Sequence, residues 1–149
     1  MICLGIESTA HTFGCGIIDD KGKIYANVTD AYKTETGGID PSEAKKHHEE
    51  VKDKVIEEAL KIANLKLEDT DLISFSQGPG IAPCLLVGMK EAKELTNRLN
   101  VPLVGVNHCI SHLEIGKLMT KAKDPVLLYA SGANTQIIAY ERGKYRVFG

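Results

Sequence analysis

Two histidines four residues apart are the side chains in this sequence most suited to chemistry. His108 and His112 follow the apolar run 101–106, and Asn107 is a suitable N-cap for a helix beginning there. Residues four apart lie on one face of a helix, so both imidazoles could bind one metal ion. The alternative is that one histidine marks a helix start and the other lies on a solvated or core face.

Cys109 adjoins this pair but would be rotated by about 100° from His108 on a helix, which favours packing in the core. A metalloprotease would carry a glutamate there as general base, as in H-E-x-x-H. Because position 109 is cysteine, the pattern disfavours proteolysis. Cys3, Cys15 and Cys84 form no C-x-x-C pair, so all four thiols are expected to be buried and reduced.

The remaining histidines and one glutamate lie in two other segments. His48 falls on the apolar face of an expected helix over residues 41–64, which favours a hydrogen-bonded core histidine, and His47 would point about 100° away. His11 lies in the first polar turn and is a candidate neighbour of a substrate. Glu7 closes the first expected strand, and the residues around it assign it no role.

Composition bounds the class of protein. The chain has 149 residues, 43% hydrophobic and 26% charged, which is typical of one soluble globular domain. Its net charge of −2 argues against a nucleic-acid-binding protein acting alone. The first four residues lack a signal peptide's basic region, and no apolar run approaches the roughly 20 residues that span a bilayer. We therefore expect a cytoplasmic protein that does not contact membranes.

The elements that must position these residues are strands and helices in alternation. Strands are expected at 2–6, 14–18, 23–31, 72–75, 101–106, 126–130 and 135–140, with one more from 145; helices are expected at 41–64, 83–99 and 107–118. Residues 76–80 form a tight loop. Three strands followed by alternating helices and strands predict an α/β fold with a mixed sheet.

An internal repeat accompanies this pattern. The opening order of apolar strand, serine-containing turn, strand, glycine-containing turn and strand returns from residue 126 to the last residue. Ser8 and Ser131 hold equivalent turn positions, as do Gly22 and Gly143. The second copy stops at its third strand and would leave an exposed sheet edge. We therefore expect a truncated chain, or a sheet that another segment completes.

Four strings in order carry a resemblance to a known family: GIESTAHT at 5–12, SQGPG at 76–80, VNHCISHLEI at 106–115 and YASGANTQ at 129–136. Over its whole length the chain resembles the archaeal and eukaryotic branch of the tRNA threonylcarbamoyladenosine transferases. That branch is the catalytic subunit of the KEOPS complex and was formerly called O-sialoglycoprotein endopeptidase.

The resemblance implies an ASKHA (actin/hexokinase/Hsp70-like) fold. Residues 1–124 would form the N-terminal lobe, and residues 125–149 would form the opening β-meander of a second, incomplete lobe. The implied reaction is an acyl transfer, in which a threonylcarbamoyl group moves from its adenylate to the adenosine beside the tRNA anticodon.

Site residues carried over from the family are a metal set and a substrate turn. His108, His112 and Tyr129 would hold one iron or zinc ion. The turn contacting threonylcarbamoyl-AMP, or an ATP or ADP analogue, would consist of Tyr129, Ala130, Ser131, Gly132 and Ala133. No catalytic side chain is assigned, because the carbamoyl carbon of a mixed anhydride is already activated and positioning should dominate.

Two departures from the family pattern bear on activity. The family continues well beyond this chain's length, and the missing half supplies an aspartate ligand and the rest of the second lobe, so this chain alone is expected to be inactive. Ala133 stands where the family has glycine, and its Cβ would disfavour a positive φ and crowd a ligand.

The implied partners are the missing C-terminal half, a small dimerisation subunit, an atypical kinase, and tRNA bound through the complex. The alternative function is a non-catalytic ASKHA scaffold or dimerisation subunit of the same tRNA-modification pathway.

Overall fold

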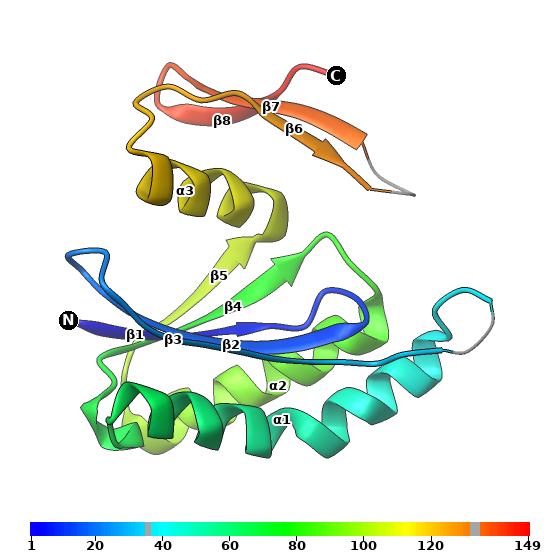
Figure 1. Cartoon of the computed structure of the whole chain (residues 1–149), viewed down its shortest axis with the longest axis vertical. Coiled ribbons are helices and arrows are strands. Elements are labelled where there is room, and N and C mark those ends of the chain that lie inside the picture. Colours follow the sequence, from blue (N-terminus) through cyan, green and yellow to red (C-terminus); the bar gives the residue numbers. More distant parts are fainter. Residues whose placement is uncertain (35–36, 132–134) are drawn as a thin grey trace. The chain divides into compact units, whose positions relative to one another are not determined.

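The computed structural model describes residues 1–34, 37–131 and 135–149. Its elements, in chain order, are β1 (Ile2–Glu7), β2 (Thr12–Asp19), β3 (Ile24–Ala31), α1 (Pro41–Ala63), a 3₁₀ turn (Leu67–Asp69), β4 (Leu72–Gly78), α2 (Ala82–Leu99), β5 (Leu103–Asn107), α3 (His108–Thr120), β6 (Leu127–Ala130), β7 (Thr135–Glu141) and β8 (Lys144–Val147) (Figure 1). The chain is therefore α/β, as predicted. Within the described ranges, no helix is long and apolar enough to cross a membrane.

The chain forms two compact units, Met1–Val106 and Asn107–Gly149. Helix α3 therefore groups with the strands that follow it. The predicted lobes separate after residue 124 instead and place this helix in the first lobe. That lobe assignment stays a prediction.

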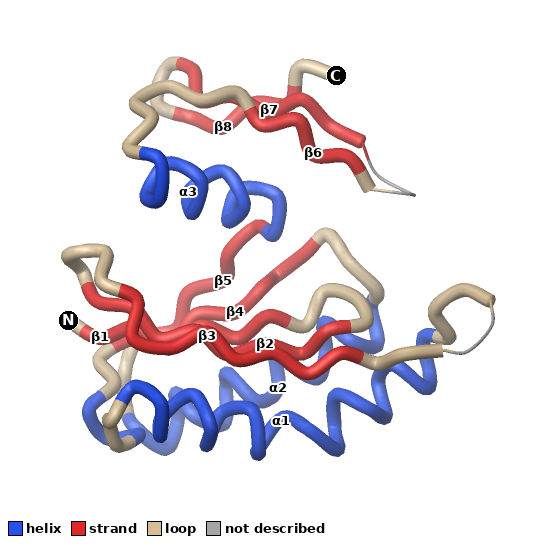
Figure 2. The backbone as a smooth tube through the Cα atoms, viewed as in Figure 1, coloured by secondary structure: helices blue, strands red, loops and turns tan. Residues whose placement is uncertain are grey.

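The first unit is built on a five-stranded mixed sheet with the order β3-β2-β1-β4-β5. The first three strands form an antiparallel meander, and β4 pairs parallel to β1. Side chains alternate between the two faces of a strand, and Leu4 and Ile6 on β1 accordingly point into the core. Phe13, Cys15 and Ile17 do the same on β2. Both helices of this unit cover one face of this sheet (Figure 2).

Helix α1 has the boundaries that its capping residues dictate. Asp40 accepts hydrogen bonds from the backbone N–H groups of Ser42 and Glu43, and Pro41 takes the first helical position. Asn64 ends the helix in the left-handed conformation, with φ 54°. The buried face carries Val55, Ile56 and Ala59 into the core beneath the sheet.

Helix α2 packs against the same sheet and against α1. Val87, Ala92 and Leu95 enter the common core. Across the two helices, Lys52 Nζ lies 2.7 Å from Glu91 Oε2, and the Glu91 side chain is only 9% exposed. Burial opposes the charge on Lys52, but Asp53 and Glu91 outweigh it and raise the pKa of this lysine.

The second unit repeats the opening meander of the first. Strands β6, β7 and β8 form an antiparallel sheet in that order, with Leu127 opposite Ile138 and Ile138 opposite Val147. Cys109 and Leu113 of α3 form a small core with Ile138, and Leu127 and Tyr129 pack at its edge. The predicted internal repeat is confirmed.

Candidate functional site

The start of α3 positions the histidine pair. The side-chain oxygen of Asn107 accepts hydrogen bonds from Cys109 N at 2.9 Å and Ile110 N at 3.2 Å, which fixes His108 as the first helical residue. The predicted N-cap and helix start are therefore confirmed. The hydroxyl of Ser111 donates to the carbonyl oxygen of His108 at 2.6 Å, which occupies it within the first turn.

The two imidazoles face each other on one side of this helix. His108 Nε2 and His112 Nε2 are 3.2 Å apart, and the ring centroids are separated by 4.6 Å at an interplanar angle of 85°. Two nitrogens bound tetrahedrally to one zinc, each at about 2.05 Å, would lie about 3.3 Å apart. The same spacing also permits a hydrogen bond when one ring donates a proton. The pair thus has the separation that a shared ion requires.

Tyr129 reaches this pair from strand β6 of the same unit. Its ring centroid lies 5.9 Å from that of His108 and 5.7 Å from that of His112. The strand alternation explains this placement: Leu127 and Tyr129 share the face on which α3 packs, and Leu128 between them is exposed. The structure therefore brings together the three side chains that the family resemblance implies as metal ligands.

The donor set fits a borderline divalent metal. Two imidazole nitrogens and a phenol oxygen are ligands that zinc and iron accept, and the set leaves positions for further ligands. In the described part of the chain, no group of three or more His, Cys, Asp and Glu residues could hold a metal ion. The histidine pair with Tyr129 would supply at most part of the ligands of such an ion, and their role as metal ligands stays a prediction.

Cys109 does not belong to this set. Its side chain is 1% exposed and packs with Leu113 and Ile138, as its rotation on the helix predicts. Burial raises the pKa of its thiol, which disfavours the thiolate that metal binding needs. All four cysteines are free; Cys15, Cys84 and Cys109 are buried as predicted, whereas Cys3 is only half-buried, so the prediction of a buried thiol is wrong there.

The predicted substrate turn lies only partly within the described residues. Ala130 ends β6 opposite Thr135, and both Ala130 and Ser131 are exposed. Gly132 and Ala133 lie outside the described residues, so the expected effect of a Cβ at position 133 stays a prediction. Gln136 is a residue that sequence reasoning missed. It stands opposite Tyr129 in the ladder, and opposed residues share one face of a sheet.

Glu7, to which sequence reasoning assigned no role, joins the ends of two parallel strands in the first unit. Its Oε1 accepts from Thr9 N at 2.8 Å and from the Thr9 hydroxyl, and its Oε2 accepts from the Ser76 hydroxyl. Two glycines allow the chain after β4 and helix α2 to approach the turn at Ser8 and Thr9 closely. A Cβ at Gly80 would lie 2.4 Å from Thr9 O, and one at Gly88 would lie 2.2 Å from Ser8 Oγ. The position of Thr9, two residues after Glu7, could have suggested the first of these hydrogen bonds. The hydrogen bond from Ser76 could not be predicted from the local sequence.

The second histidine pair does not resemble the first. His48 is fully buried against Phe13, as predicted, but among the described residues neither ring nitrogen makes a well-formed hydrogen bond. Burial, followed by nearby His47, lowers the pKa of His48, although Ala10 and Glu7 favour its proton. His47 points away and places Nε2 3.1 Å from Asp30 Oδ1. His11 is exposed.

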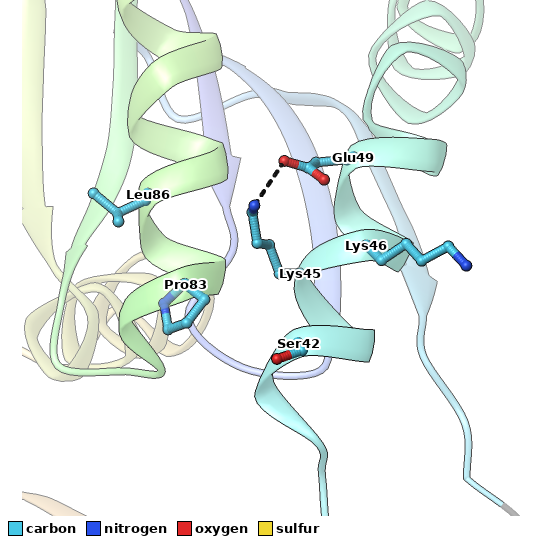
Figure 3. A pocket seen from close by; sticks show the side chains of 6 residues that line it. All are labelled: Ser42, Lys45, Lys46, Glu49, Pro83 and Leu86. Atoms are coloured by element: carbon cyan, nitrogen blue, oxygen red, sulfur yellow. Dashed lines mark ion pairs between the residues drawn. The ribbon is translucent and has the colours of Figure 1, made fainter.

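A hollow of about 440 Å³ lies between the N-terminal parts of α1 and α2 (Figure 3). Lys45 points along α1 toward Glu49, 3.3 Å away, whereas Lys46 points outward. Pro83 and Leu86 form its α2 side. Ser42, Lys46 and the Lys45–Glu49 pair make up the α1 side of the lining.

Comparison with known proteins identifies relatives over the whole chain. Residues 23–149 match the family model of TsaD, tRNA N6-adenosine threonylcarbamoyltransferase. The protein of that name from Thermococcus gammatolerans is 54% identical over 149 residues, which cover all of this chain and 45% of that protein. A probable bifunctional tRNA threonylcarbamoyladenosine biosynthesis protein from Methanosphaera stadtmanae is 52% identical over 149 residues, covering all of this chain and 28% of that protein. This chain thus spans less than half the length of these curated relatives.

Solved structures similar to this chain support the fold class. YeaZ from Pseudomonas aeruginosa aligns with a TM-score of 0.69 and 13% identity, covering 99% of this chain and 64% of that one. A putative N-acetylmannosamine kinase, Lmo2764 from Listeria monocytogenes, aligns with a TM-score of 0.60 and 15% identity, covering 98% and 49%. At these identities the likeness concerns the fold alone, and it confirms the predicted ASKHA class.

Proposed function

The chain belongs to the tRNA N6-adenosine threonylcarbamoyltransferase family, and we propose that it forms the N-terminal part of a metal-dependent transferase. The substrate is threonylcarbamoyl adenylate, and the acceptor is the adenosine beside the anticodon of a tRNA. The observation that carries this proposal is the convergence of His108, His112 and Tyr129, with 3.2 Å between the two Nε2 atoms.

The reaction requires activation and positioning more than a protein nucleophile. The exocyclic N6 of adenosine attacks the carbamoyl carbon, a C–N bond forms, the C–O bond to the phosphate breaks, AMP leaves and N6 loses a proton. A bound iron or zinc ion would supply Lewis-acid stabilisation of charge on an oxygen. Neither the hydroxyl nor the thiol next to the histidines in sequence is available as a nucleophile, since the Ser111 hydroxyl is bound to a carbonyl and Cys109 is buried.

The side chains of this unit hold the site in place. Asn107 fixes the first turn of α3, and the small core around Cys109, Leu113 and Ile138 holds that helix against β6 and β7. Tyr129 is thereby kept beside the imidazoles. Ala130 and Ser131 follow Tyr129 directly, so these two residues are the proposed contacts of the adenylate nearest in sequence to the residues that would hold the ion.

Further chain and further subunits complete this activity. The transferase relatives extend well beyond the part that this chain matches. We propose that this remainder supplies the missing ligand and second lobe, and that the 149-residue chain is inactive without it. A small dimerisation subunit, an atypical kinase and tRNA are the proposed partners of the assembled protein.

A chimaera tests this proposal. This chain replaces the matching N-terminal part of the Thermococcus gammatolerans protein, and transfer to tRNA is measured with threonylcarbamoyl adenylate supplied. We expect transfer and one bound metal ion per chain. His112→Ala should lower both metal affinity and transfer by at least about tenfold, because it removes one donor. His47→Gln, which removes a histidine from the first unit, is the matched control and should retain both.

The outcomes separate the two candidate functions. A chimaera that assembles and folds but neither binds metal nor transfers the group would favour the scaffold or dimerisation role. Transfer that is unaffected by His112→Ala would contradict a role for the histidine pair. An inactive 149-residue chain beside an active chimaera is the expected result for the fragment.

A further inference from the structure

The two units of the chain carry net charges of opposite sign, which the small net charge of the whole chain does not show. Residues 1–106 contain 12 Lys and Arg against 17 Asp and Glu, whereas residues 107–149 contain six against three. The first unit is therefore acidic and the second basic. The second unit also carries the histidine pair and Tyr129. A basic surface on the unit that holds the candidate site is a feature that the proposed chemistry has not used.

The cations of the second unit gather at one end of its sheet. Lys121 and Lys123 lie on the connection that leads from α3 into β6, and Arg142 and Lys144 lie at the turn from β7 into β8. The antiparallel register places the start of β6 beside the end of β7, so both connections lie at the same end (Figure 1). We call these four residues the basic end.

Strand β8 contacts α3 beside the basic end. The Tyr145 hydroxyl of β8 donates to Glu114, and Lys117 Nζ lies 2.9 Å from the same carboxylate. Three carboxylates accompany the basic end: Glu114, Asp124 and Glu141. Glu141 lies between two arginines, 3.5 Å from Arg142 and 3.6 Å from Arg146. Exposed pairs of this kind are weak and leave the side chains able to exchange partners.

Two of these cations occupy backbone positions that favour other residues. Lys121 caps α3 in the left-handed conformation with φ 59°, where α1 and α2 use Asn64 and Asn100. Arg142 has φ 49° and precedes Gly143 with φ 79° in a two-residue hairpin turn, a position that favours asparagine or glycine. Asparagine would thus fit the left-handed backbone conformation better at both places. The cationic side chains point to a role outside the fold.

We propose that the basic end binds the sugar–phosphate backbone of the RNA whose adenosine enters the candidate site. This inference rests on the proposed function. Phosphates are recognised by exposed, flexible lysine and arginine side chains, and the Arg142 side chain is 84% exposed. Nine to thirteen helical residues separate Lys121 from His112 and His108, about 14–20 Å along the axis. An RNA strand held at one end of α3 can therefore present a base at the other.

The test exploits the strained backbone. In the double variant Lys121→Asn, Arg142→Asn, both residues suit the left-handed conformation, so Tm should not fall. Binding of a fluorescent anticodon stem–loop RNA to the 149-residue chain is measured by anisotropy at several KCl concentrations. We expect about fivefold to tenfold weaker binding at low salt. The slope of log Kd against log salt should fall by about 1–2, as for the loss of two phosphate contacts.

Two control variants separate the effect of charge at the basic end from the effect of charge in general. Lys61→Gln, Lys93→Gln removes the same charge from the helices of the first unit and should change Kd by less than about twofold. Lys121→Arg, Arg142→Lys keeps both charges and should keep binding.

The proposal is overturned when the asparagine variant binds RNA like the original chain. The proposal is also overturned when the control pair Lys61→Gln, Lys93→Gln loses as much affinity. It is overturned as well when the original chain fails to bind RNA, even if the basic end binds another polyanion such as poly-L-glutamate. RNA binding that depends on the basic end, together with a chimaera that does not transfer the group, would instead reject the proposed function and leave this surface standing.

Discussion

Asn107 fixes the helix on which the histidine pair depends. An unpaired backbone N–H at a helix start costs free energy, and this side chain accepts two of them. The same local rules place His108 and His112 on one face, so this half of the site was predictable from the local sequence at 101–112. Tyr129 was not predictable in this way, because its strand lies beyond the end of α3 and only the family resemblance pointed to it.

We expect Asn107→Ala to destabilise the second unit by about 1 kcal/mol, because two N–H groups lose their acceptor. Urea unfolding, followed by the fluorescence of the tyrosines in this unit, measures the change. Asn107→Ser keeps a capping oxygen and should lie within a few tenths of a kcal/mol of the original chain. An alanine variant as stable as the serine variant would show that the cap does not hold the helix start.

Glu7 and His48 mark the limit of inference from residue type. The carboxylate partner Ser76 is 69 positions away in the sequence. The apolar face predicted that His48 is buried, but a core histidine was expected to be hydrogen-bonded. Its ring nitrogens instead make no well-formed hydrogen bond among the described residues. This outcome depends on how several elements pack around the ring, which residue type alone does not reveal.

At the scale of elements, turn and capping residues determined what could be predicted. Helix α1 begins where Asp40 and Pro41 predict, and it ends within one residue of the limit that its helical spacing predicts. Strand β4 is longer than predicted and runs to Gly78, whereas the glycine–proline string predicts a loop from residue 76. The meander repeat was predictable because its apolar strands and glycine turns recur in order. The close approach of α2 to the Ser8 turn was not, because it depends on Gly88 within a helix.

Two helical glycines give opposite predictions. Gly88→Ala would bring a Cβ to 2.2 Å from Ser8 Oγ, which forces α2 away from the Ser8 turn and should cost about 1–3 kcal/mol. Gly116→Ala in α3 meets nothing within 4 Å and should stabilise its helix by up to about 1 kcal/mol, because alanine restricts the unfolded chain. Chemical denaturation of both variants measures the two changes. Equal effects of the two substitutions would contradict the close packing of α2 against the Ser8 turn.

For the whole molecule, each unit is stabilised by its own core. The core of the first unit contains Leu4, Phe13 and Ile73 between the sheet and its two helices. The core of the second unit consists of Cys109, Leu113 and Ile138. Small cores supply little stability, so the second unit should unfold more readily than the first. Leu128 and Ile137 on the other face of its sheet are exposed, at 66% and 43%.

The pH dependence of stability should report on the first core. Burial lowers the pKa of His48 below its ordinary value of 6.5, so the unfolded chain binds this proton more readily than the folded one. Stability from this residue is therefore present above about pH 6.5 and is lost as the pH falls toward the lowered pKa. The loss should approach about 1.4 kcal/mol per pH unit for one proton.

Urea titrations at pH 5, 6 and 7 measure this dependence. His48→Leu should flatten the acid side of the stability profile, because the variant has no buried imidazole to protonate. His11→Gln, which removes an exposed histidine, should leave that side nearly unchanged. Identical profiles for His48→Leu and the original chain would contradict the assignment.

The most direct test of the central claim is a zinc titration of the 149-residue chain, monitored by isothermal calorimetry. Convergence of His108, His112 and Tyr129 predicts one site per chain. Removing either imidazole should weaken that site by at least about tenfold, and Tyr129→Phe should weaken it less. His11→Gln should bind zinc like the original chain. Unchanged affinity in both His108→Ala and His112→Ala would contradict a metal site at this position.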